Sequence, residues 1–216
     1  MKINRLSRRH VIFTSTHHKD WILHMHLIKS QKHNFIIDTG FGPKNIEEIF
    51  AEGGRDKPYI LINTHSHWDH IWGNCAAKGF PIVAHKLCSE LMDKNFDSDY
   101  TRNSQYSQGN VIKQNPTVLF EKELYFPEDK IRLIYTPGHT IDSISIYDEQ
   151  EKVLNAADNI GDIGNPLVPH LDCDEQIYKQ TLLIYNSLGF ETCICAHNDI
   201  FGKDIVNKIL NELNHL

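Results

Sequence analysis

The sequence places side chains that can bind metal ions directly after short apolar segments, and it does so four times. The first such segment, 59–63, is followed by Thr-His-Ser-His-Trp-Asp-His at 64–70, and later segments end at further His and Asp residues. Short continuous apolar runs are typical of buried strands. Strands that pack in one sheet or sandwich bring such ends together at one rim. We therefore expect these side chains to converge there: His65, His67, Asp69, His70, His139, Asp158 and His197.

The spacing within 64–70 favours a metal site. Side chains alternate in an extended segment, so His65 and His67 point the same way and can bind one ion together. Asp69 and His70 follow where the chain turns toward a helix expected from 71–77, so they can face a second ion. Imidazole and carboxylate ligands suit zinc, and also iron or manganese. The alternative is a polar loop that happens to be rich in histidine.

The rest of the chain alternates expected strands and helices. Strands are expected at 11–13, 21–28, 35–37, 80–84, 131–135, 143–147, 151–157 and 192–196. Helices are expected from about Pro43, at 86–94, at about 174–188 and at 203–213. Between them, 95–115 is polar and has no clear periodicity, which is typical of a lid or a disordered insertion. Because it also carries Tyr100 and Tyr106, we favour a lid.

Other polar residues lie near these strand ends. Asp38 is either a residue of the turn into a helix or a carboxylate that orients a metal-binding histidine, and both can hold. His24 and His26 share one face of a strand and could bind metal, but nothing later in the sequence pairs with them, so we expect them at the surface or half-buried. His85 is expected at a helix entry or behind the ligands. His170 could touch a substrate or be an ordinary loop residue.

Composition excludes several classes of protein. The length of 216 residues fits one domain, and the net charge of −6 argues against a broad basic surface for nucleic acid. No apolar run approaches the roughly 18 residues of a membrane helix, and the basic N-terminus lacks the apolar core of a signal peptide. Five cysteines, an odd number, fit reduced thiols in the cytoplasm. Cys193 and Cys195 lie in an apolar run and are expected in the core.

The combined motifs resemble the metallo-β-lactamase superfamily, in its binuclear hydrolase branch. The residues that carry the resemblance follow the family's order: Asp38-Thr39-Gly40, Thr64 to His70, Thr136-Pro137-Gly138-His139-Thr140, Asp158 and Ala196-His197-Asn198. The resemblance implies an α/β fold, a four-layer αβ/βα sandwich, formed by 1–216 as a single domain. It also implies that His65, His67 and His139 hold one divalent ion, that Asp69, His70 and His197 hold a second, and that Asp158 bridges both.

Two positions depart from the family pattern. Ile141-Asp142 stand where the family often has Pro-Gly, and Asn198 stands where a glycine commonly follows the last ligand. Asp and Asn tolerate the left-handed conformation that a turn can require. We therefore expect altered loops and an unchanged set of metal ligands.

The mechanism expected from two adjacent cations is hydrolysis by a metal-bridging hydroxide. Asp69 and Asp158 could position the proton of the attacking water, although both are also expected ligands. A small ester, thioester or lactone is the favoured substrate, as in relatives of the glyoxalase II or lactonase type. A β-lactamase is disfavoured because those enzymes are exported and lack the aspartate that matches Asp158. A phosphodiesterase of the same superfamily and a non-catalytic metal-binding module are the alternatives.

Overall fold

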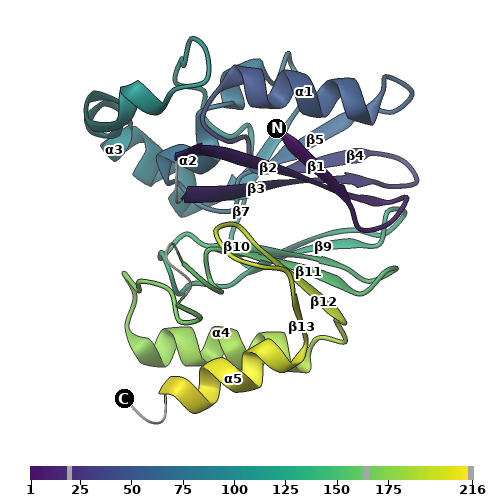
Figure 1. The fold of residues 1–216 in the computed structure, drawn as a ribbon, viewed down its shortest axis with the longest axis vertical. Helices are drawn as coiled ribbons and strands as arrows, with labels where there is room; N and C mark the ends of the chain where they lie inside the picture. The colour runs from purple at the N-terminus through teal and green to yellow at the C-terminus, as the bar shows by residue number, and fades with distance from the viewer. Residues whose placement is uncertain (19–20, 163–165, 214–216) are drawn as a thin grey trace.

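Two mixed β-sheets face each other in a computed structural model that describes residues 1–18, 21–162 and 166–213 (Figure 1). In the described residues the N-terminal sheet has the strand order β1-β2-β3-β4-β5-β6-β7 and the C-terminal sheet has the order β13-β12-β11-β10-β9-β8. The N-terminal sheet comprises β1 (Lys2–Arg5), β2 (His10–His18), β3 (Trp21–Lys29), β4 (Asn34–Ile37), β5 (Tyr59–Ile62), β6 (Ile82–His85) and β7 (Val118–Phe120). The C-terminal sheet comprises β8 (Glu123–Phe126), β9 (Ile131–Tyr135), β10 (Ile144–Asp148), β11 (Val153–Ala157), β12 (Thr192–Cys195) and β13 (Phe201–Gly202).

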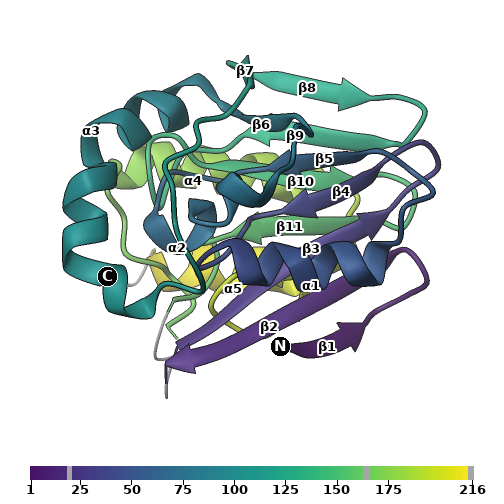
Figure 2. The same cartoon turned by 90° about the horizontal axis from the view of Figure 1, so that it is seen from above.

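Helices cover the outer face of each sheet. The N-terminal half carries α1 (Pro43–Gly53), α2 (Trp68–Ile71) and α3 (Lys86–Asn103), with 3₁₀ turns at Asn74–Ala76 and Ser104–Tyr106. The C-terminal half carries α4 (Glu175–Ser187) and α5 (Asp204–Leu213). Figure 1 shows α1 and α3 on one side of the paired sheets and α4 and α5 on the other, and Figure 2 shows α1 running across its sheet with α3 at one end. The predicted four-layer αβ/βα sandwich is confirmed.

Apolar contact between the layers holds the sandwich together. Ile36, Leu61 and Ile82 pack under α1 through Ile46 and Ile49, whereas Tyr178 and Leu182 of α4 pack with Ile205 of α5 on the other sheet. The facing sides of the two sheets form a third cluster that includes Phe35, Ile37, Ile62, Leu133, Ile144 and Ile146. β4 and β5 are buried along their whole length because a parallel pair of this kind is covered on both faces. This explains why they appear in the sequence as continuous apolar runs.

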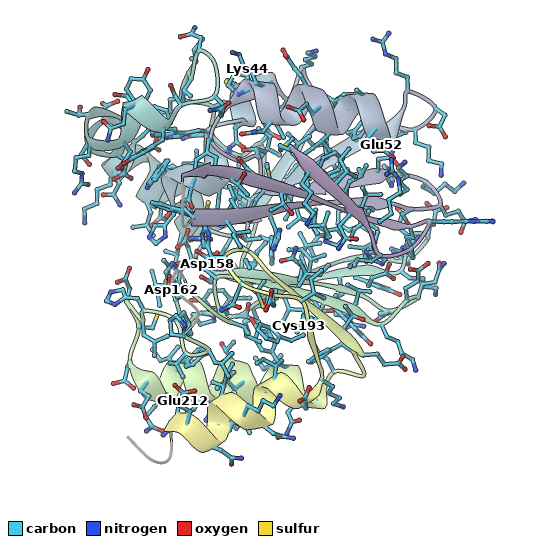
Figure 3. The ribbon with its side chains drawn as sticks, viewed as in Figure 1. Lys44, Glu52, Asp158, Asp162, Cys193 and Glu212 are labelled. Carbon is cyan, nitrogen blue, oxygen red and sulfur yellow. The ribbon has the colours of Figure 1, made fainter. Side chains whose placement is uncertain are left out.

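The strand ends meet at one rim, as expected. Backbone hydrogen bonds join the two sheets there, from His24 N to Ala196 O (2.8 Å) and from Ile144 N to Thr64 O (2.9 Å). Figure 3 shows Asp158 between the two halves, at the end of the sandwich where α3 lies. The rim is therefore part of the rigid frame rather than a free set of loops.

Residues 95–103 are helical, which differs from the expected structureless stretch. The predicted helix at 86–94 continues as α3 to Asn103. Cys88, Met92 and Phe96 are its buried residues, and Tyr100 packs beside them. Residues four apart form a narrow apolar stripe on a helix. Most other residues of α3 are polar, so the composition of the segment did not indicate a helix. Whether the segment closes over the rim stays a prediction.

Membrane-spanning helices are not found in the described ranges, where every helix is too short or too polar to cross a bilayer.

Candidate metal centre

Seven side chains meet at the rim in two adjoining groups. His65, His67, His139 and Asp158 form one group, and Asp69, His70 and His197 form the other. Within each group the potential ligand atoms lie within 4.8 Å of one another. His67 Nδ1 is 3.1 Å from His139 Nε2, and His197 Nε2 is 3.2 Å from Asp69 Oδ2. The structure thus brings together every residue that the sequence placed at the rim, while their role as metal ligands stays a prediction.

The carboxylate of Asp158 lies between the two groups. Its Oδ1 is 3.4 Å from His70 Nε2, while its Oδ2 is 3.7 Å from His65 Nε2, 3.6 Å from His139 Nε2 and 3.3 Å from His197 Nε2. One carboxylate therefore faces imidazoles of both groups. This is the arrangement that a bridging ligand requires.

The turn after β5 places the central motif. His67 is extended (φ −63°, ψ 144°), and α2 begins at the next residue, Trp68. The helix thus starts inside the motif rather than at 71–77 as expected, and Asp69 and His70 lie on its first turn. The extended part directs His65 and His67 to one group, and the helical turn directs Asp69 and His70 to the other.

Asp38 fixes two of the imidazoles through their outer nitrogens. Asp38 Oδ2 accepts hydrogen bonds from His70 Nδ1 (2.8 Å) and from the Thr64 hydroxyl (2.8 Å). The Thr64 oxygen is in turn 3.0 Å from His65 Nδ1 and accepts its hydrogen. Asp38 has a left-handed backbone (φ 60°) directly after β4, so it is both a turn residue and an orienting carboxylate, as the sequence suggested.

Backbone carbonyls fix two more imidazoles. His139 Nδ1 is 2.8 Å from the carbonyl oxygen of His170, and His197 Nδ1 is 2.7 Å from that of Ile22. Trp21 Nε1 also lies 3.2 Å from His197 Nδ1, but the nearer carbonyl of Ile22 can only accept, which places the hydrogen on Nδ1. With both outer nitrogens donating, the inner Nε2 keeps its lone pair for a cation. The side chain of His170 is 76% exposed, and its contact with a substrate stays a prediction.

Unpaired buried atoms show that the seven residues fit cations. His65 Nε2, His70 Nε2, Asp69 Oδ2 and Asp158 Oδ1 are buried, and none has a hydrogen-bond partner in the part of the chain that the structure describes. Leaving buried polar and charged atoms unpaired is costly. All four point into the space between the two groups, where bound cations would satisfy them. The donor set of imidazoles and carboxylates suits zinc, and also iron or manganese.

The charges within the cluster shift the pKa values of its members in opposite directions. Burial would raise the pKa of Asp158, but His70 and His197 pull it well below its usual range. Burial opposes the charged form of His197 as well, yet Asp158 and Asp69 raise its pKa to about 10. The same kind of contact with Asp158 and Asp69 raises the pKa of His70 well above its usual value despite burial. Burial, reinforced by His70, instead lowers the pKa of His65.

A cavity of about 400 Å³ opens over the two groups. Trp21 and Trp68 form one wall, with ring centroids 5.4 Å apart. Asp99, Arg102 and Asn103 line the mouth from the end of α3. The segment that was expected to be a lid therefore borders the cavity.

Two contributors were missed from the sequence. Asn159 accepts a hydrogen bond from His139 N (2.9 Å) and donates one to Thr136 O (2.7 Å), so it fixes the turn that carries His139. Arg102 lay in a stretch without visible periodicity. For Asn159, the sequence offered one indication of a role in the site, which is its position directly after Asp158.

Three other expectations have clear outcomes. His85 caps α3, where its Nδ1 accepts from Leu87 N, so the predicted helix entry is confirmed. Cys193 and Cys195 are fully buried, as expected. The expectation for His26 is wrong, because its side chain is buried between the sheets and contacts His10 and Asn155, whereas His24 is half-buried.

Comparison with known proteins assigns the family. A model described as the metallo-beta-lactamase superfamily matches residues 21–197. The chain belongs to the metallo-β-lactamase superfamily. It is 28% identical over 176 residues to a probable metallo-hydrolase of Methanocaldococcus jannaschii, covering 78% of this chain and 73% of that protein. It is 24% identical over 162 residues to an acyl-coenzyme A thioesterase of Bos taurus, covering 63% of this chain and 57% of that protein.

A solved metallo-beta-lactamase from Pontibacter korlensis has the same fold. It superposes with a TM-score of 0.77 at 21% identity, covering 100% of this chain and 99% of the other. At this low sequence identity, the similarity supports a shared fold and not a shared activity. The prediction of a metal-dependent hydrolase of this superfamily is confirmed by these matches, whereas the number and identity of its ions stay predictions.

Proposed function

We propose that this superfamily member hydrolyses a small thioester with two divalent cations, zinc fitting best, at the seven-residue rim site. The observation that carries the proposal is Asp158, whose carboxylate faces imidazoles of both groups and has a buried oxygen without a hydrogen-bond partner among the described residues. His65, His67 and His139 would hold one cation, and Asp69, His70 and His197 the other.

The cations would supply Lewis acidity and a water whose pKa is lowered toward neutrality. The chain itself supplies orientation. Asp38 and the carbonyls of Ile22 and His170 hold the imidazoles with their lone pairs inward. Asp69 and Asp158 are the carboxylates of the site that could position the proton of an attacking water, although both would also hold cations. Most of the seven side chains are buried, and the lower local dielectric strengthens each of these interactions.

The cavity supports a substrate with an apolar part and an anionic part. Trp21 and Trp68 offer an aromatic wall beside the second group, where an acyl chain can pack. Arg102 stands at the mouth, held by Asp99 at 2.9 Å, where it can meet an anionic carrier. The acyl-coenzyme A thioesterase among the relatives combines those two substrate features. This favours a thioester over an ester or a lactone.

Metal analysis and a substrate panel test the proposal. Protein purified and loaded with zinc should contain two ions per chain. It should hydrolyse acyl-coenzyme A or acyl-glutathione thioesters faster than p-nitrophenyl acetate, a homoserine lactone, bis-p-nitrophenyl phosphate or nitrocefin. Asp158→Ala should abolish turnover and lower the metal content, whereas Glu191→Gln, at an exposed carboxylate at the end of β12 opposite His197, should change neither.

Two results would overturn this assignment. Fastest cleavage of the phosphodiester would identify a phosphodiesterase instead. Two bound ions without turnover of any substrate class would identify a non-catalytic metal-binding module.

A further inference from the structure

A connected row of polar side chains crosses the core between the two sheets. It joins His10 of β2 and His26 of β3 to Asp148 of β10 and Asn155 of β11, and all four residues are buried. Its neighbours on the facing sheets, Ile12, Val153 and Ile194, are apolar. Apolar side chains would pack the two sheets together without the cost of burying polar groups. The polar row must therefore have another role.

The row has a fixed direction, set at the Asn155 end. The backbone N–H of Ala157 donates to Asn155 Oδ1 (3.0 Å), which leaves the amide nitrogen of Asn155 facing His26 Nδ1 at 3.3 Å. His26 Nδ1 must therefore accept, and its hydrogen sits on Nε2. Nε2 is 2.9 Å from His10 Nδ1, so His10 accepts there and carries its own hydrogen on Nε2.

Asp148 terminates the row. His10 Nε2 lies 3.0 Å from Asp148 Oδ2, and the same carboxylate oxygen accepts from the guanidinium of Arg9. The amide N–H of Asn155 and the Nε2–H of His26 thus both point along the row toward His10, whose Nε2 lies beside this buried carboxylate within ion-pair distance but without a hydrogen bond to it. Burial, together with the positive charge of Arg9, holds the pKa of His26 well below its usual value, which keeps its ring neutral as the direction requires.

The other end of the row meets the backbone that presents Asp158. The pairing of β11 with β12 shifts register between Asn155 and Ala157. Ala157 has a left-handed backbone (φ 47°), which is uncommon for a residue with a side chain. The Asn155 side chain closes this bulge by accepting from Ala157 N, and Asp158 follows directly. The conformation before Asp158 is therefore held by a side chain that His26 and His10 orient in turn.

We propose that Asn155, His26 and His10 are positioning residues for Asp158: the directed row from Asp148 to the Ala157 bulge sets the placement of the carboxylate between the two cation groups. The inference rests on the proposed two-cation function for the meaning of that placement. The direction of the row rests on the hydrogen bonds alone.

Three variants test the row by metal retention. Asn155→Leu removes both the acceptor for Ala157 N and the donor to His26, and should weaken binding of both ions by about 10- to 100-fold in competition with a chelator. Asn155→Asp keeps the acceptor and should retain both ions with nearly wild-type affinity. Asn34→Leu is the matched control, because Asn34 is a buried asparagine that donates to Gly53 O at the far end of β4 from the site. It should lose stability without losing affinity.

Histidine tautomers give a second readout that needs no metal or turnover. ¹⁵N spectra of cation-free protein should show His26 as a neutral ring protonated on Nε2. In Asn155→Asp the new carboxylate faces His26 Nδ1, so His26 should become protonated on both nitrogens. This readout applies even if Asn155→Leu does not fold.

Each outcome separates the row from the proposed function. Protonation of His26 on Nδ1 in the wild type, an unchanged His26 in Asn155→Asp, or wild-type affinity in folded Asn155→Leu would overturn the row. A wild-type chain that binds no more than one ion, with the tautomers as expected, would overturn the two-cation function and leave the direction of the row intact.

Discussion

Asp38 orients one histidine in each of the two groups. Its carboxylate accepts from His70 Nδ1 and from the Thr64 hydroxyl, and Thr64 accepts from His65 Nδ1. The backbone N–H of Thr64 also donates to Asp38 Oδ1 at 2.8 Å. A single buried carboxylate that is saturated by donors thus sets the direction of one imidazole ring in each group.

Protons held by the cluster make metal binding pH-dependent. Without a cation, the pKa of His197 is about 10 and that of His70 is well above its usual value, so both rings are charged at pH 7.5. A cation must displace these protons. Adding zinc to the cation-free protein should therefore release about two protons at pH 7.5, and affinity should rise as pH rises toward the pKa of His197.

Calorimetry in buffers of different ionisation enthalpy measures this release. His197→Ala should release about one proton fewer than the wild type, because one charged ring is absent. Zinc binding without any proton release would show that both rings are neutral before binding.

The sequence predicted the individual residues of the rim better than their partners. All seven side chains follow strand candidates, and that position alone predicted their convergence. The placement of His26 was wrong because its partners, His10 and Asn155, come from a neighbouring strand and from the opposite sheet. No local pattern indicates a pairing between sheets. Asn159 was missed because its partners, Thr136 and His139, follow another strand of the same sheet, and no local pattern indicates that contact either.

At the scale of elements, α3 shows how composition can conceal a helix. Its polar residues face solvent, and only the stripe formed by Cys88, Met92, Phe96 and Tyr100 meets the core. That stripe extends the helix past Lys94 and carries Arg102 to the cavity mouth. Edge strands were missed for a related reason: β7 is short and exposes Val118 and Leu119, so it lacks the buried run by which β5 was found.

The turn after α2 packs so closely on the Asp38–Gly40 loop that it has no room for a side chain. A Cβ on Gly73 would lie 2.2 Å from the carbonyl oxygen of Thr39 and 2.9 Å from Ile46 Cγ1. Thr39 N in turn donates to His70 O at 2.8 Å, so the contact joins the two loops that carry the site. Gly73→Ala should destabilise the protein by about 1–3 kcal/mol in urea unfolding, and lower the affinity of the group that contains His70.

Gly189→Ala provides the control for that substitution. Its Cβ would have Tyr147 Oη at 3.5 Å as its nearest neighbour, an ordinary contact. Equal stability of the two variants would show that the two loops can separate without cost.

For the whole molecule, the position of the site between the two sheets links metal binding to stability. His65, His67, Asp69 and His70 come from the N-terminal half, and His139, Asp158 and His197 come from the C-terminal half. Cations held there would bind the native sandwich and not the unfolded chain. Saturation at about 100 times the dissociation constant would add about 2.7 kcal/mol to the free energy of unfolding for each cation bound.

Removal of metal should therefore lower the melting temperature of both halves together. Trp21, Trp68 and Trp72 all lie in the N-terminal half, so their fluorescence reports on that half. Far-ultraviolet circular dichroism reports on both halves. The two signals should shift downward by the same amount after chelation, and Asp158→Ala should show no such shift. Separate transitions for the two signals would contradict a site shared between the sheets.

A metal site between the two sheets would also make the lifetime of the protein in a cell depend on the supply of metal ions. If the site binds zinc as proposed, scarce zinc would remove ions that join the halves and raise the population of the open form, which proteases degrade. The quantity of enzyme in a cell would then follow zinc availability without any change in gene expression.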